Sequence, residues 1–232
     1  MEEFLSSNMG MLVLLAVPAL LSLFAQFWVK STFRKYSNTK NSRNINGAQA
    51  AKTLLEINGI HNVGIQSVAG ALTDHYDPGK KVLRLSEPVY ASTSIAAVGV
   101  SAHETGHAIQ HNVNYAPLVL RSTLVPIANI GSNAGPYLII AGIIASISFL
   151  TTLGIILFSG AVAFYIVTLP VEFNASRRAL QNLEANNILS FEELKGAKKV
   201  LTAAALTYVA SAVTAVANLL RLILMARKRR DD

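Results

Sequence analysis

The run His103-Glu104-Thr105-Gly106-His107 holds the residue types best suited to chemistry in this chain. In an α-helix, residues four positions apart lie on one face, so the imidazoles of His103 and His107 can bind the same metal ion. Zinc accepts such a pair, and at a catalytic site it takes three protein ligands and one water molecule. Glu104 is placed to take the proton of that water. The pattern predicts a hydrolytic zinc site.

The surroundings of this motif favour a metal site over a chance pair of histidines. Residues 95–102, immediately before it, are small or apolar. Burying two histidines and a glutamate in such a helix without a metal or another partner would be costly.

The third zinc ligand must come from elsewhere in the chain. His111 lies four residues after His107, but eight residues of helix cover about 12 Å, so His103 and His111 cannot both reach one ion. The chain has no cysteine, which excludes a thiolate ligand, disulfides and a cysteine nucleophile. A carboxylate from a second helix is the economical solution.

Glu172 is the best placed carboxylate, because it lies where a long apolar segment ends. In an alternative interpretation, Glu172 is an acidic residue at the start of a helix that begins after Pro170, where it complements the helix dipole. The two roles are compatible. We favour ligation, since a catalytic zinc site of this class needs one carboxylate.

The composition predicts an integral membrane protein. Of 232 residues, 52% are hydrophobic and only 14% are charged, against about 25% charged in soluble domains. The formal net charge is +7, but the basic residues stand beside apolar segments, where they set topology and contact lipid headgroups. We therefore expect membrane lipids as partners and no nucleic acid.

Four apolar segments are long enough to cross a bilayer, which needs about 20 residues each. They cover approximately residues 9–29, 124–145, 150–169 and 201–220. The segment 201–220 is the weakest candidate span, because it is rich in Ala and Thr and precedes the basic run 227–230. It either spans the membrane or lies on its surface. The predicted fold is mainly α, a helical membrane bundle of one domain (1–232) with a minor β-hairpin.

The basic residues Lys30, Arg34 and Lys35 follow the first span, so the positive-inside rule puts the next segment in the cytoplasm. His107 and Glu172 can meet only if an even number of crossings separates them. We therefore predict a multi-pass protein of the cell membrane, with a catalytic portion (44–116 and 170–199) on the cytoplasmic side.

Within that portion the sequence predicts three local elements. A helix begins at the N-cap Asn46 and ends at Gly59. Two strands, at residues 63–68 and 82–85, form a hairpin across the turn residues 77–79. Ser92 or Thr93 then caps the helix that carries the zinc motif.

The chain resembles the YugP-type membrane zinc metallopeptidases of bacteria, a family similar in pattern to the HtpX-type and CAAX prenyl proteases. The segments that carry the resemblance, in chain order, are 72–78 (LTDHYDP), 83–86 (LRLS), 96–111 with the zinc motif, and 171–179 (VEFNASRRA). The resemblance implies a gluzincin-like endopeptidase in which His103, His107 and Glu172 bind one Zn²⁺ and Glu104 is the base. Asn174 departs from the aspartate expected there, which bears on metal affinity if that carboxylate orients a ligand histidine.

Stabilisation of the oxyanion has several candidates. His75 and Tyr76 lie in a cluster that is equally well explained as a turn before a strand. Arg177, or its neighbour Arg178, is a second choice. The strand at 82–85 is a candidate to bind extended substrate by β-augmentation.

These patterns together predict a membrane-bound zinc endopeptidase that cleaves peptide or membrane-protein substrates with glutamate-activated, zinc-bound water. One alternative is a non-proteolytic membrane scaffold or chaperone-like subunit in which the zinc is structural. A metal transporter is disfavoured, because acidic residues are expected in several of its spans and residues 9–29 and 124–169 have none.

Overall fold

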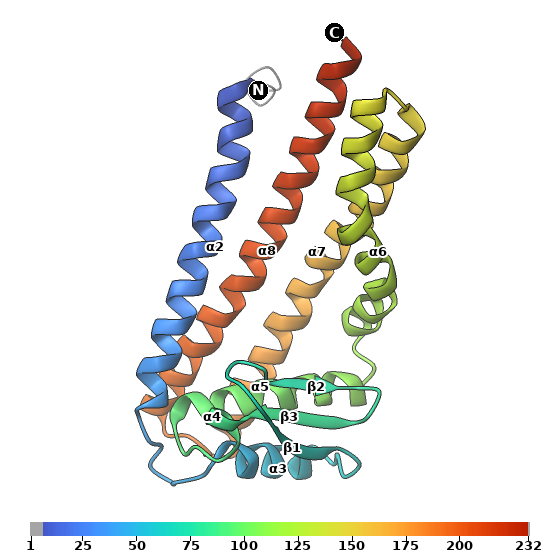
Figure 1. Ribbon diagram of the computed structural model, residues 1–232. Helices are drawn as coiled ribbons and strands as arrows, with labels where there is room; N and C mark the ends of the chain where they lie inside the picture. The colour runs from blue at the N-terminus through green and yellow to red at the C-terminus, as the bar shows by residue number, and fades with distance from the viewer. Residues whose placement is uncertain (1–6, 232) are drawn as a thin grey trace. The chain divides into compact units, whose positions relative to one another are not determined.

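The computed structural model describes residues 7–231 of the chain (Figure 1). Its helices are α2 (Asn8–Ser37), α3 (Gly47–Ile57), α4 (Glu87–Tyr90), α5 (Ile95–Asn112), α6 (Ala116–Ala145), α7 (Ser148–Ala185) and α8 (Phe191–Asp231). Its strands are β1 (Gly64–Val68), β2 (His75–Asp77) and β3 (Val82–Ser86). The prediction of a mainly α fold is confirmed.

The chain divides into two compact units. A helical unit contains the chain up to residue 25, residues 120–169 and the chain from residue 207. A mixed unit contains residues 26–119 and 170–206, and it holds the sheet, α3, α4 and α5. The single domain predicted for residues 1–232 stays a prediction.

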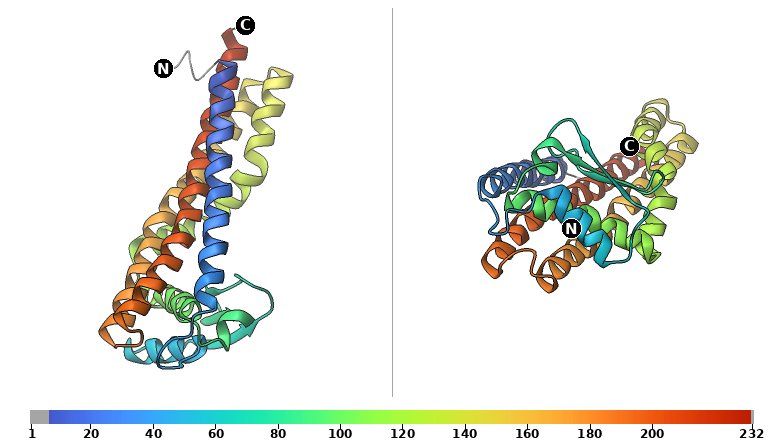
Figure 2. Two further views of the ribbon diagram at one scale, coloured as in Figure 1. Left: turned by 90° about the vertical axis from the view of Figure 1, so that its left-hand side faces the viewer. Right: turned by 90° about the horizontal axis from the view of Figure 1, so that it is seen from below.

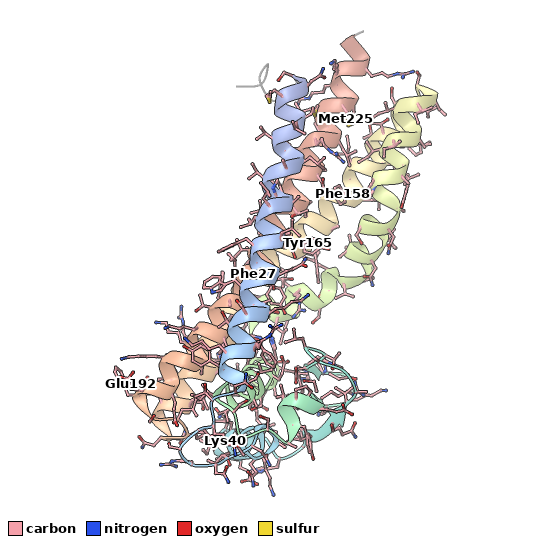
Figure 3. All side chains as sticks on the ribbon, turned by 60° about the vertical axis from the view of Figure 1, so that its left-hand side comes forward. Phe27, Lys40, Phe158, Tyr165, Glu192 and Met225 are labelled. Atoms are coloured by element: carbon pink, nitrogen blue, oxygen red, sulfur yellow. The ribbon has the colours of Figure 1, made fainter. Side chains whose placement is uncertain are left out.

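Four helices, α2, α6, α7 and α8, are long and apolar enough to cross a membrane, as the four apolar segments predict. Many of their large side chains face outward, as lipid-facing residues must. Phe27 of α2, for example, is 73% exposed and projects from its helix in Figure 3. The long α6 and α7 tolerate internal prolines at 126, 136 and 170, which membrane helices accept more readily than soluble ones.

Two details of these helices differ from the sequence prediction. The turn expected at residues 146–152 is shorter, because α6 ends at Ala145 and α7 begins at Ser148, with Ser146 at φ 58°. The idea that a helix begins after Pro170 is wrong, because α7 continues through this proline. Glu172 therefore lies inside a helix, where it has no first-turn role.

The sheet has three strands in the order β1-β3-β2, so the predicted pairing of β1 and β3 as a hairpin is wrong. The hairpin is formed by β2 and β3, which are antiparallel, whereas β1 pairs with β3 in parallel. The turn between β2 and β3 is closed by the Lys80 N–H, which donates to the Asp77 carboxylate. The central strand β3 pairs with β1 over residues 82–86 and with β2 over residues 82–84, so the predicted addition of a substrate strand along 82–85 is wrong.

The helix caps follow the sequence closely. Asn46 and Gln49 form the capping box of α3, and Gly59 follows its last turn with φ 68°. The cap of α5 is Ser94, one or two positions after the predicted Ser92 or Thr93. Ser94 accepts the Ala97 N–H, and the Ser92 hydroxyl donates to Ser94 instead of capping the helix.

The helix α5 is the centre of the mixed unit. Its side toward the sheet packs with α3, α4 and β3 around the fully buried Leu83 and Leu85. Its other side packs with α3, α7 and α8 around Val98, Ala102 and Leu183. Figures 1 and 2 show α3 beside α5, and α5 behind the strands in Figure 1. The zinc motif is thus carried on the most enclosed helix of this unit.

Gly106, inside the motif, sets the distance between α5 and α7. A Cβ atom at Gly106 would lie 2.6 Å from the backbone oxygen of Ala175, closer than real contacts allow. Any larger residue would push α7, and with it Glu172, away from the histidines.

We expect Gly106→Ala to lower the free energy of unfolding by about 1–3 kcal/mol, through overpacking against rigid backbone. Zinc content should fall with it, because Glu172 moves with α7. The control is Gly64→Ala on β1, where the nearest atom to the new Cβ is 3.8 Å away. Thermal unfolding and zinc analysis of both purified variants measure stability and metal content. If Gly106→Ala and Gly64→Ala give the same stability and zinc content, the role assigned to Gly106 is wrong.

Candidate metal centre

The helices α5 and α7 bring three potential metal ligands together. The Nε2 atom of His103 lies 3.2 Å from Oε2 of Glu172, and Nε2 of His107 lies 3.6 Å from the same oxygen. One ligand atom from each of the three residues lies within 4.8 Å of the other two. The residues selected from the sequence as metal ligands therefore form one group.

The spacing of these atoms fits a tetrahedral zinc site. Ligand atoms about 2.1 Å from a tetrahedral ion stand about 3.4 Å from one another. The two measured distances to Glu172, 3.2 and 3.6 Å, lie on either side of that value. Two imidazoles and one carboxylate also match the donor set of catalytic zinc. Within residues 7–231 the group has three members, which leaves a coordination position for water or substrate.

Both carboxylates at the centre are buried. Glu172 is 1% exposed and Glu104 is 8% exposed. Burial raises the pKa of Glu104, and the nearby histidines act in the opposite direction. Two buried acids close to each other repel, so a bound divalent cation would stabilise the pair.

The second nitrogen of each histidine is also paired. Nδ1 of His103 lies 3.1 Å from the Ser176 hydroxyl, and Nδ1 of His107 lies 3.0 Å from Oε1 of Gln110. Both Nε2 atoms are thereby left facing Glu172. Neither Ser176 nor Gln110 was found from the sequence. The available signal was their helical spacing, because Gln110 stands three residues after His107 and Ser176 four residues after Glu172.

A chain of hydrogen bonds fixes the orientation of Gln110 and the proton on His107. Arg178 Nε can only donate, and it does so to Oδ1 of Asn174 at 2.8 Å. The same oxygen accepts from Nε2 of Gln110 at 3.0 Å, and this amide also donates to the Val171 carbonyl. The Gln110 oxygen must then face His107, so His107 Nδ1 carries a proton and Nε2 has a free lone pair.

Asn174 therefore acts differently from the expectation raised by the sequence. It contacts Gln110 and Arg178 and supports His107 through Gln110. An amide can satisfy this position, because its oxygen accepts from both neighbours.

Comparison with known families matches residues 11–227 to the model of a family described as "Putative neutral zinc metallopeptidase". The chain belongs to this family. The chain is also 48% identical over 221 residues to the "Putative membrane protease YugP" of Bacillus subtilis (strain 168), covering 95% of this chain and 98% of the relative. No solved structure matches it. The expected resemblance, the zinc cofactor and the membrane character are thus confirmed.

The structure places the three oxyanion candidates, His75, Tyr76 and Arg177, in different surroundings. His75 is exposed, with Nδ1 2.8 Å from the Thr73 carbonyl and Nε2 3.3 Å from the Arg84 guanidinium. Arg177 is exposed on α7. Tyr76 is half-buried, and its hydroxyl lies 2.8 Å from Nδ1 of His111 on α5. The hydrogen bond between Tyr76 and His111 links this candidate directly to the helix that bears the zinc motif.

The cluster around Tyr76 also has a structural role. Asp74 accepts hydrogen bonds from the backbone N–H and the hydroxyl of Ser86, and burial raises the pKa of its carboxyl. The Lys80 N–H and the Arg84 guanidinium hold the pKa of Asp77 below its usual range. These two acids tie the strands β2 and β3 together.

We expect Gln110→Leu to weaken zinc binding by about 10- to 100-fold, because the variant removes the acceptor that orients His107. Competition with a fluorescent chelator measures the dissociation constant. The matched control is Gln66→Leu, the same change at an exposed position of β1. Wild-type zinc affinity in a folded Gln110→Leu protein would show that the hydrogen-bond chain does not support the ligand.

Proposed function

We propose that this protein is a membrane endopeptidase in which His103, His107 and Glu172 hold one zinc ion and Glu104 is the general base. The observation that carries the proposal is the convergence of both Nε2 atoms on the Glu172 carboxylate. A three-ligand group favours catalysis over a structural zinc, which is normally closed by four protein ligands.

Each step of peptide-bond hydrolysis is assigned to a group that is suitably placed for it. Zinc, when bound, supplies a Lewis acid that polarises the scissile carbonyl and makes water a better nucleophile. Glu104, adjacent to His103 and buried, takes the proton of the attacking water and returns it to the leaving amine. The burial that raises the pKa of Glu104 suits this double role, since the carboxyl must hold the proton between the two steps.

Tyr76 and His111 are proposed to contact the substrate. His111 lies seven residues after Glu104, so both side chains stand on one face of α5, about 10 Å apart along its axis. This separation is about three residues of an extended peptide. Tyr76 is therefore better placed for a neighbouring part of the substrate than for the oxyanion itself. Arg177 and His75 stay as candidates for stabilising the oxyanion.

The position of the site relative to the membrane is also a proposal. Residues 26–119 and 170–206 fold as one unit, which supports an even number of crossings between the two ligand-bearing segments. The basic flank of the first span supports the cytoplasm as their location. Substrates would be peptides or membrane proteins that reach this side.

Glu104→Gln should retain one zinc per chain and lose hydrolysis by about 10²–10⁴-fold, because an amide cannot accept the proton. His107→Ala should lose the zinc as well. Metal analysis and cleavage of a quenched fluorescent peptide library in detergent measure both. The control is Glu87→Gln, which changes an exposed glutamate outside the ligand group. Full activity of Glu104→Gln would exclude the assigned base.

Single cysteines at Ser42, Ser148 and Ser190 report the topology, because the native chain has no cysteine and all three serines are exposed. Only the cysteine at 148 should react with an impermeant maleimide in intact cells, while all three react after permeabilisation. Opposite accessibility at 42 and 190 would break the two-crossing arrangement and the Glu172 assignment. Labelling at 42 and 190 but not at 148 would invert the orientation.

A further inference from the structure

A polar cavity lies in the helical unit, which does not contain the three metal-ligand residues. It has a volume of about 250 Å³ and is formed by the end of α6, the start of α7 and the last turns of α8. Its polar lining consists of four hydroxyl side chains and two arginines, Ser146, Ser148, Thr151, Thr152, Arg227 and Arg229. Among the residues up to 229, whose side chains the structure describes, no acidic residue lines it.

This set of groups suits an oxyanion. Arginine presents several N–H donors in a fork that matches phosphate, and hydroxyl groups add further donors. Ser148 is the first residue of α7, so the N-terminus of this helix, the positive end of its dipole, lies at the same place. Two guanidinium groups, four hydroxyls and a helix N-terminus therefore surround one cavity.

The apolar surroundings distinguish a lipid from a free anion. Ile144 and Phe149, which flank the α6–α7 turn, are 70% and 71% exposed. The three helices that form the cavity are all candidate membrane spans. Exposed apolar side chains at the end of a span contact acyl chains, while basic residues at the same level contact headgroups.

We propose that this cavity binds the phosphate headgroup of an anionic phospholipid. Arg227 and Arg229 neutralise the headgroup, the hydroxyls of the α6–α7 turn orient it, and Ile144 and Phe149 pack against its acyl chains. The site would anchor the C-terminal end of α8 to the α6–α7 turn. It is independent of the proposed peptidase activity.

The proposal also accounts for the charge at the end of α8. If residue 148 lies outside the cell, the cavity puts Arg227 and Arg229 on that side too, against the usual preference of basic residues for the cytoplasm. A bound anionic headgroup attracts basic residues to this level, which acts against that preference.

The test is lipid retention by the full-length, zinc-loaded protein. Native mass spectrometry counts the phosphatidylglycerol and phosphatidylcholine molecules that stay bound after purification from mixed bilayers. We expect one phosphatidylglycerol to be retained, and its affinity to fall about tenfold or more in Arg227→Gln/Arg229→Gln, given that each basic residue contributes about 1 kcal/mol at a membrane surface. Zinc content should not change, which separates this result from the metal centre.

The matched control is Lys228→Gln, an exposed basic residue between the two arginines that does not line the cavity. If this control loses phosphatidylglycerol to the same extent, general surface charge explains the result and the proposal is overturned. Inorganic phosphate at millimolar concentration should not displace the lipid, and displacement would assign the site to free phosphate. If the double variant does not fold, Thr152→Val, which removes one hydroxyl at constant size, should weaken retention, and unchanged retention would contradict the proposal.

Discussion

The close approach of α5 to α7 is the constraint on which the rest of the structure depends. A glycine at position 106 lets the backbone of α7 come near enough for Glu172 to reach both histidines. The apolar packing of α5 against α3, β3, α7 and α8 then holds this geometry from several sides. A zinc site requires its ligands within tenths of an ångström of fixed positions, and here that precision comes from helix packing, since α5 and α7 carry all three ligand side chains.

The sequence was informative wherever local rules decide the structure. Helical periodicity placed the two histidines on one face, and the length of the apolar segments predicted four long helices, which the structure confirms. The Asn46 cap followed from residue type alone. The geometric argument against His111 also held, because this residue pairs with Tyr76 and is not part of the ligand group.

The errors arose where partners far apart in the chain decide the structure. A sequence that alternates apolar and polar residues indicates a strand but not its neighbour, so the parallel pairing of β1 with β3 could not be predicted. Pro170 resembles a helix start in isolation, yet inside a membrane span it is accommodated by the surrounding helices. Gln110 was overlooked because a buried glutamine has no special pattern. Its role depends on Asn174 and Arg178, more than sixty residues later in the chain.

The order of the ligands along the chain has a consequence for biosynthesis. Glu172 follows His103 by 69 residues, and α6 and more than half of α7 lie between them. At ordinary synthesis rates this separation takes about 3–14 s. During that interval the nascent chain has His103, Glu104 and His107 but lacks Glu172. The complete ligand group therefore forms only after α6 and most of α7 have been synthesised, so a nascent chain cannot assemble the metal centre before then.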